Sequence, residues 1–299
     1  MSTAEFKLLT CNLFHDLPRF RHLERRLDLI AAEVTAHRPD VIALQEVSRS
    51  AAGGDAGASL AARVNLRCAN APYRLDYARA DGSGEGEHLF EEGLAIMSRL
   101  EACAPAEILK FDAQVRLEAQ FAGHRYRLPD DRIAMRARYR IPNKVELQVC
   151  VTHLTDSIET TGGVAIRLQQ ARELVAWLER AGDPSSSLLA SSLLLAGDFN
   201  DVPDSGTIAA ITGAGFIDLW QAAGSGPGFT NDRDDIDIES PHGAHNQRID
   251  YLFFRPGRGR GSEIAEVGLF LDRPRPTPDG GWLWASDHAG VIATIKFRF

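Results

Sequence analysis

Short apolar runs that stop abruptly at acidic or amide side chains recur along this chain. LLTCN ends at Asn12, VIALQE ends at Glu46, and LLLAGDFN ends with Asp198 and Asn200. A continuous apolar run is typical of a strand that is buried on both faces. Such strands need covering layers on both sides of their sheet, which favours an α/β fold with the polar strand ends at its rim.

Segments with helical spacing of apolar residues separate several of these runs. After a strand predicted over residues 7–12, this spacing predicts a helix from Leu23 to Val34, and Pro39 ends that segment before a second strand over residues 41–45. This order indicates a β-α-β unit. We predict two more helices, over residues 58–66 and 164–178. Further strands are predicted at residues 73–78, 94–97, 108–111, 115–121, 132–141 and 145–154, from residue 193, and at residues 249–254, 264–270 and 291–297.

The expected fold is a four-layer α/β sandwich, in which two packed mixed sheets are flanked by helices. Repeated strands between residues 94 and 154 favour an antiparallel sheet edge there. The stretches DGSGEG (81–86) and DPSSS (183–187) are predicted loops. The length of 299 residues allows two domains, but no low-complexity linker divides the chain. We therefore expect a single domain over residues 1–299.

Composition and charge exclude several classes of protein. The first residues lack the basic and apolar regions of a signal peptide, and no apolar run reaches ~18 residues, the length that spans a membrane. The four cysteines have no CxxC spacing. We expect a soluble, cytoplasmic monomer without a transmembrane segment. The net charge of −8 argues against broad affinity for the phosphate backbone of nucleic acid, although a local basic patch remains compatible with it.

The polar strand ends predict a metal site. A single Asp after a strand is usually a turn or cap residue. Several strands of one sheet that end at the same rim would, however, bring many oxygen donors together, and gathered carboxylates cannot all stay ionised without a cation. These donors indicate a hard cation, Mg²⁺ first, with Mn²⁺ as an alternative and Ca²⁺ less expected. The candidate side chains are Asn12, Glu46, Asp198, Asn200, Asp250 and Asp287, with His153 and His288 available for proton transfer.

Seven segments, in this order, resemble the endonuclease/exonuclease/phosphatase superfamily. They are TCN (10–12), LQEV (44–47), EGLAIMSR (92–99), THL (152–154), GDFN (197–200), RIDYLF (248–253) and SDH (286–288). The likeness covers residues 8–297 and implies two packed sheets with a divalent metal at their rim. Cys11 departs from the pattern, because many members have Trp at that position.

The resemblance also implies roles for individual residues. Glu46 resembles the main metal ligand, with Asn12 and Asp287 nearby. Asp198 and Asn200 would position the attacking water and the phosphate, with Phe199 anchoring their turn in the core. Two pairs resemble the acid-base residues of the family: Asp250 orients His288 to assist attack, and Glu92 pairs with His153 to protonate or stabilise the leaving oxygen. The implied reaction is metal-assisted in-line attack of water on a phosphate ester.

The substrate stays open between three classes of phosphate ester. For nucleic acid, Arg136, Arg138 and Arg140 share one strand face near Tyr126 and Tyr139, and Arg132 is expected to point into the site. For a lipid headgroup, Trp282, Leu283 and Trp284 precede Asp287. For a small soluble ester, the stretch 228–250 and a segment after THL supply polar side chains. These are Arg233, His242, His245 and Arg248, with Arg167 and Gln170.

From the sequence, we predict a Mg²⁺-dependent phosphoesterase, with a diester favoured over a monoester. A nuclease acting on DNA or RNA is the first alternative. A non-catalytic phosphate-binding module of the same fold is the hypothesis from another class. The expected contacts with substrate come from Arg132, Arg167, Arg248 and Trp284.

Overall fold

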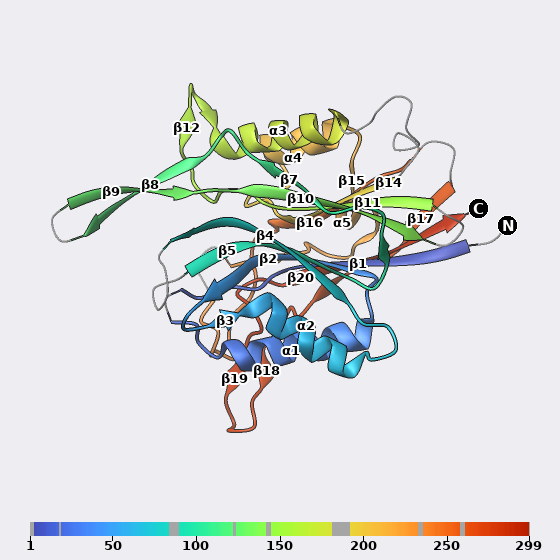
Figure 1. The fold of residues 1–299 in the computed structure, drawn as a ribbon, viewed down its shortest axis with the longest axis horizontal. Helices are drawn as coiled ribbons and strands as arrows, with labels where there is room; N and C mark the ends of the chain where they lie inside the picture. The colour runs from blue at the N-terminus through green and yellow to red at the C-terminus, as the bar shows by residue number, and fades with distance from the viewer. Residues whose placement is uncertain are drawn as a thin grey trace.

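Two seven-stranded sheets form the centre of the protein (Figure 1). The structure is a computed structural model, and it describes residues 3–17, 19–83, 90–121, 124–141, 145–180, 192–232, 236–257 and 261–298. No helix within these ranges has both the length and the apolar character needed to cross a membrane.

The first sheet joins strands from both ends of the chain. Its order is β17 (Gly261–Phe270), β20 (Gly290–Arg298), β1 (Thr3–Asn12), β2 (Val41–Ser50), β5 (Phe90–Ser98) and β4 (Arg74–Ser83), with β3 (Gly54–Asp55) paired to β2. β1 and β2 are parallel and are linked by α1 (Leu23–His37), which confirms the predicted β-α-β unit. The last two strands also return to this sheet, since β20 pairs with β1 along most of its length.

The second sheet is built from the middle of the chain. Its order is β15 (Ile217–Asp218), β16 (Asp250–Arg255), β14 (Ser192–Asp198), β11 (Val145–His153), β10 (Ile133–Ile141) and β6 (Glu101–Ala102), with β7 (Glu107–Lys110) also paired to β10. β11 and β14 are parallel, so His153 and Asp198 end neighbouring strands at the same edge. Three hairpins stand apart: β8 (Val115–Phe121) with β9 (His124–Asp130), β12 (Thr160–Thr161) with β13 (Val164–Ala165), and β18 (Arg275–Pro276) with β19 (Trp282–Leu283).

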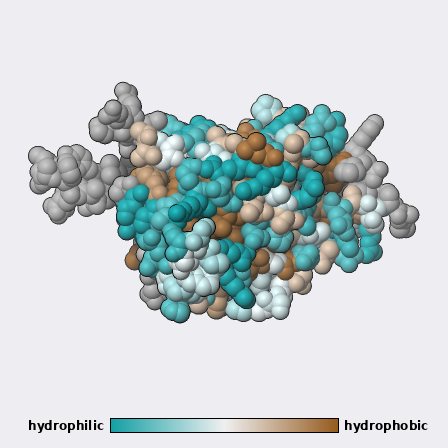
Figure 2. Space-filling model, turned by 90° about the horizontal axis from the view of Figure 1, so that it is seen from below, coloured by the Kyte–Doolittle hydropathy of each residue, from teal (hydrophilic) through white to brown (hydrophobic). Residues whose placement is uncertain are grey.

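Three apolar cores separate four layers. The largest lies between the two sheets and includes Phe6, Ile96, Val149 and Phe254. A second core packs α1 and α2 (Ala56–Arg67) on the first sheet, and a third packs α3 (Ile166–Arg180) and α4 (Gly206–Gly213) on the second (Figure 1). Seen from the side of α1 and α2, the outer surface is mainly hydrophilic (Figure 2). The predicted four-layer α/β sandwich is thus confirmed.

Several boundaries differ from the sequence-based prediction. The strand expected at residues 73–78 extends to Ser83, into the stretch predicted as a loop. The strand expected at residues 115–121 joins β9 in a separate hairpin and does not enter either sheet. The short helices α4 and α5 (Leu219–Ala223) were not predicted, because neither is long enough to display a helical period. Residues 84–86 and 183–187 lie outside the described ranges.

A close approach between β14 and β11 depends on Gly197. Its φ of 143° lies in a region that L side chains avoid, and a Cβ there would lie 1.9 Å from the backbone carbonyl oxygen of Thr152. We expect Gly197→Ala to destabilise the fold by about 2–6 kcal/mol, adding backbone strain to overpacking. Urea unfolding would measure this loss.

Gly213 provides the matched control for this prediction. It lies in α4, and a Cβ there would meet nothing within 4 Å. Gly213→Ala should therefore be neutral or stabilising by up to about 1 kcal/mol. Equal stability of the two variants would contradict the proposed close approach.

Candidate active site

A cavity of about 520 Å³ opens where strands of both sheets end. It is polar, and eight of the side chains selected from the sequence line it: Glu46, Arg132, His153, Arg167, Asp198, Asn200, Asp287 and His288. The remaining lining residues include Asp156, Asp201, Asp232, Asn231 and Gln247. The tertiary fold therefore brings together polar residues from segments nearly 250 positions apart.

Asn12 at the end of β1 meets Glu46, which lies within β2 directly after the last residue paired with β1. The buried Asn12 donates from Nδ2 to Glu46 Oε1 at 3.0 Å and to Asp198 Oδ2 at 3.2 Å. Its Oδ1 accepts the backbone N–H of Phe14 at 2.9 Å, so the amide is fixed in orientation. Glu46 has a positive φ of 51° at an irregularity in the pairing of β2 with β5. Asn12 thus orients Glu46 and links it to Asp198.

Asp198 and Asn200 lie in a tight turn after β14. Phe199 is fully buried between them and packs edge-on against Tyr251 and Phe253, which confirms that it anchors the turn. The Asn200 backbone N–H donates to Asp198 Oδ1 at 2.8 Å, and Asn200 itself has a positive φ of 51°. The side chains converge because the backbone turns at Asn200.

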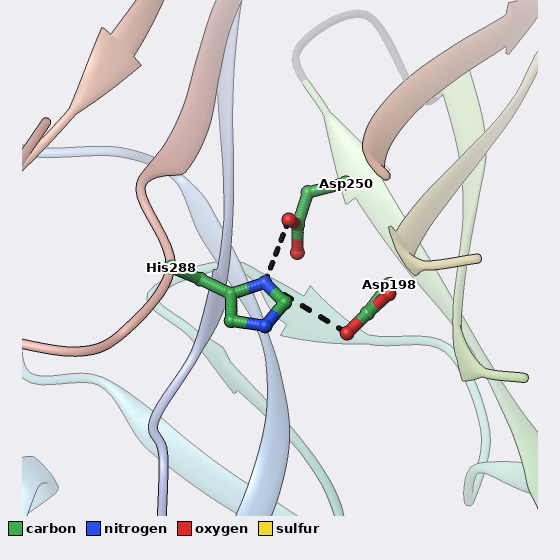
Figure 3. A group of neighbouring side chains, drawn as sticks. All are labelled: Asp198, Asp250 and His288. Carbon is green, nitrogen blue, oxygen red and sulfur yellow. Dashed lines mark hydrogen bonds and ion pairs between the residues drawn. The ribbon is translucent and has the colours of Figure 1, made fainter. Parts of the chain in front are cut away.

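Asp250 and His288 form a short hydrogen-bonded pair. His288 Nδ1 lies 2.8 Å from Asp250 Oδ2 and 3.8 Å from Asp198 Oδ2 (Figure 3). Asp198 and Asp250 come from paired strands of the second sheet, whereas His288 precedes β20 of the first sheet. The backbone N–H of Asp250 donates to Thr230 Oγ1 at 3.1 Å, which fixes the start of β16. Among the described residues, the buried Asp250 Oδ1 has no hydrogen-bond partner.

His153 and Glu92 approach each other with Arg132 between them. Arg132 Nη1 lies 2.9 Å from His153 Nδ1 and 3.4 Å from Glu92 Oε1, while Glu92 Oε1 lies 3.8 Å from His153 Nδ1. The last distance is too long for a hydrogen bond. Arg132 faces Nδ1 of the ring, while Nε2 lies 3.1 Å from Asn200 Nδ2 and 3.5 Å from Asp198 Oδ2. The arrangement differs from the expected pair, because Arg132 lies between Glu92 and His153 and contacts both side chains.

Charges around the two histidines separate their protonation states. Burial lowers the pKa of His153 well below its ordinary value, and the charge of Arg132 adds to this effect. Burial would also lower the pKa of His288, but the charges of Asp250, Asp287 and Asp198 outweigh it and raise that pKa well above the ordinary value. His153 is therefore neutral and His288 is cationic at neutral pH.

The carboxyl groups are also shifted from their ordinary values. Burial, with the charge of Asp250, raises the pKa of Asp198 to about 7. Burial, with the charge of Glu46, raises the pKa of Asp287 to about 6. Burial alone would raise the pKa of Glu92, but a hydrogen bond from His15 and the charge of Arg132 hold it at about 2. The positive charge around Asp198 and Asp287 is therefore too small to hold the pKa of either carboxyl group at its ordinary value.

These donors fit a hard divalent cation. Glu46 and Asp287 line the same cavity with carboxylate oxygens, and their crowding with Asp198 is the kind of repulsion that a cation relieves. One ligand atom each from Asp198, Asp250 and His288 also lies within 4.8 Å of the others, but His288 is already bonded to Asp250 there. Glu46 and Asp287 are thus the better candidates to hold the ion, with Asn12 orienting Glu46.

His15 is a site residue that the sequence reasoning missed. Its Nε2 lies 3.2 Å from Glu92 Oε2 and 3.6 Å from Glu46 Oε2. His15 follows Asn12 by three positions, in the segment directly after β1. A histidine this close to a polar strand end was the signal that could have identified it.

Two expected substrate contacts have other roles in the structure. Arg248 is buried, pairs with Asp218 at 2.7 Å and lies over the ring of Tyr251. Trp284 is only 1% exposed and donates from Nε1 to the Ser240 carbonyl oxygen at 3.0 Å. Trp284 lies with Trp282 and His245 in a second, separate cavity of about 570 Å³. Neither Arg248 nor Trp284 lines the cavity that holds Glu46 and His288.

Arg167 lines the cavity and also bonds the backbone of neighbouring loops. It donates to the backbone carbonyl oxygens of Thr155, Asp156 and Asn200, and it lies 3.6 Å from Asp201. Gln170 is buried one turn further along α3 and bonds Thr155 and Ala113, so it supports the same loops. Both side chains therefore stabilise the loops that shape the cavity.

The arginines proposed for nucleic-acid contact lie outside the cavity. Arg136 is buried against Trp177 and pairs with Glu107, and Arg138 also faces Glu107. Tyr139 points the other way, into the core between the sheets. The side chain of Tyr126, as well as Arg233, lies outside what the structure describes. His242 is exposed and does not line the cavity.

Comparison with known proteins identifies a matching family model and solved structures with a similar fold. The model of the endonuclease/exonuclease/phosphatase family matches residues 9–288. No curated protein matched the chain. A family protein from Beutenbergia cavernae is 22% identical, with a TM-score of 0.66 over 97% of this chain and 71% of its own. TDP2 from D. rerio, in complex with a single-strand DNA product, is 18% identical, with a TM-score of 0.66 over 98% of this chain and 99% of its own. A mannosyl-6-phosphatase from Bacteroides thetaiotaomicron is 16% identical, with a TM-score of 0.65 over 98% and 100%.

Proposed function

The chain belongs to the endonuclease/exonuclease/phosphatase family, and on this basis we propose that it is a divalent-metal-dependent phosphodiesterase acting on small esters. The proposal depends most on one observation. Asp198, Asp250 and His288 form one group, and Asp198 and His288 line the same polar cavity as Glu46 and Asp287. Shared fold alone does not select a substrate, since the names of similar structures include both a phosphatase and a DNA-bound protein.

The ion supplies charge, and the protein supplies proton transfer. A divalent cation bound by Glu46 and Asp287 would neutralise negative charge that develops on the phosphoryl group. Asp198 lines the cavity and is suited to accept at Oδ2 a proton from the attacking water. Its position is fixed by the Asn12 amide and by the backbone N–H of Asn200.

His288 provides the opposite proton transfer. Asp250 holds its Nδ1, which leaves Nε2 as the nitrogen that can donate to the leaving oxygen as the ester bond breaks. Exchange with solvent would then remove the proton from Asp198 and return a proton to His288 Nε2. Neutral His153, held between Arg132 and Asn200, is suited to position these two side chains and not to act as a general acid.

The charge of the cavity favours a substrate with few phosphates. Among the described residues, its lining has two arginines, and both Arg132 and Arg167 already bond internal acceptors. Six acids line the same space: Glu46, Asp156, Asp198, Asp201, Asp232 and Asp287. One cation with one phosphodiester group would balance this site better than a polyanion would. We therefore propose nucleic acid only as the second candidate substrate, after small esters.

We expect the purified protein to hydrolyse bis-p-nitrophenyl phosphate with Mg²⁺ or Mn²⁺, to stop when a chelator is added, and to recover when metal is restored. Its kcat/KM for this small ester should depend only weakly on salt. Nucleic-acid binding through many phosphates would weaken roughly 10³- to 10⁵-fold between about 50 and 200 mM salt. Release of p-nitrophenolate would measure the rate.

Two results would redirect the assignment. Efficient cleavage of plasmid or single-stranded DNA with steep salt dependence would favour the nuclease alternative. Metal and phosphate binding without turnover on any nucleic acid, inositol phosphate or phospholipid would favour the non-catalytic binding module.

A further inference from the structure

We propose that His15 is a positioning residue that holds the carboxylates of Glu46 and Glu92, and thereby supports binding of the divalent cation at Glu46. The inference rests on the proposed function for the place of the cation. Its structural basis is a series of contacts. His15 contacts Glu46 and Glu92, and Glu92 in turn contacts Arg132.

The contacts of His15 give its ring one orientation. The backbone N–H of Leu17 donates to His15 Nδ1 at 3.0 Å, so the ring presents its proton at Nε2. That nitrogen lies 3.2 Å from Glu92 Oε2 and 3.6 Å from Glu46 Oε2. The backbone N–H of His15 also donates to Glu46 Oε2, at 3.2 Å. A single residue therefore contacts Glu46 twice and Glu92 once.

The segment that carries His15 is held in place from several sides. Leu13 N–H donates to the Gln45 carbonyl oxygen at 3.0 Å, and Phe14 N–H donates to Asn12 Oδ1 at 2.9 Å. The fully buried Arg26 donates to the carbonyl oxygens of Leu13 and Phe14, each at 2.9 Å. The edge of the His15 ring packs on Phe90, with the ring centroids 5.5 Å apart. His15 is thus fixed before any ligand binds.

This arrangement solves a problem of like charges. Glu46 lies on β2 and Glu92 on the adjacent β5, and both direct an oxygen towards His15. Without a donor between them, the two carboxylates would repel each other and turn away. Glu46 would then keep the Asn12 amide and the His15 backbone N–H as its partners. A partner behind a metal ligand typically contributes 10- to 100-fold to metal affinity or activity.

Two variants distinguish the hydrogen-bond donor of His15 from the packing of its ring against Phe90. His15→Gln keeps an N–H donor near the end of the side chain, whereas His15→Leu keeps similar volume against Phe90 but removes the donor. Mn²⁺ would be titrated into each full-length protein in a calorimeter, beside His37→Ala as control. His37 is exposed at the end of α1 and does not line the cavity. Thermal unfolding without metal would show that each variant is folded.

We expect His15→Leu to bind Mn²⁺ about 10- to 100-fold more weakly, and to lose kcat/KM by a similar factor. His15→Gln should recover most of the affinity, and His37→Ala should match the wild type. Unchanged Mn²⁺ affinity in His15→Leu would overturn the inference, as would equal losses in the Leu and Gln variants. If the wild type binds Mn²⁺ but hydrolyses no ester, the proposed reaction fails while these affinities still test His15.

Discussion

Replacing Glu46 by Gln is expected to lower Mg²⁺-dependent hydrolysis by at least about 10³-fold. A bound cation supplies several kcal/mol of stabilisation to the charge of the transition state, and every ~1.4 kcal/mol corresponds to a factor of ten in rate. Gln keeps the size of the side chain and its hydrogen bonding with Asn12, but it removes the negative charge that attracts the ion. Initial rates on bis-p-nitrophenyl phosphate and calorimetric Mn²⁺ binding would measure the two losses together.

Glu33 offers a matched control for this substitution. It lies on α1, pairs with Arg275 and does not line the catalytic cavity. Glu33→Gln should retain wild-type rates and Mn²⁺ affinity. If Glu46→Gln kept both properties, Glu46 could not be the main ligand, and the group of Asp198, Asp250 and His288 would become the alternative cation site.

The second large effect is expected at the pair of Asp250 and His288. His288→Gln and Asp250→Asn should each lower kcat by about 10²- to 10⁴-fold, because a positioned acid or base contributes that much. Asp250→Asn acts through the 2.8 Å contact to Nδ1, which holds the ring and favours its charged form. Residues that act as one unit give non-additive losses, so the double variant should be little worse than the worse single variant.

Kinetics and a control would test this coupling. His242→Gln removes an exposed histidine from a neighbouring loop and should leave kcat unchanged. Losses that multiply in the double variant would show that Asp250 and His288 contribute independently. Near-normal kcat in His288→Gln would remove this histidine from proton transfer.

The strand ends were predictable because apolar runs and their polar ends are local features. Asn12 and Asp198 end β1 and β14 as expected, whereas β2 continues past Glu46 to Ser50. Parallel pairing of β1 with β2, and of β11 with β14, then brings their ends to one side. The two-sheet fold followed from the same local patterns.

The partners of long side chains could not be predicted in this way. Arg248 precedes Asp250 by two positions, yet it turns to Asp218 on another element. Arg132 inserts between Glu92 and His153, which changes an expected pair into a group of three. Side chains of this length can reach several partners, and the choice depends on which charges other segments bring near.

The amino-acid sequence by itself determined the strands, their polar ends and the oxygen-rich character of the site, because hydrophobic periodicity and donor chemistry are local properties. Only the tertiary structure decided that Arg132 lies between Glu92 and His153, that Trp284 is buried and that His15 contacts Glu46 and Glu92. Those contacts depend on how the two sheets and their loops pack. Packing decides where each side chain points, which the spacing of residues along the chain does not determine.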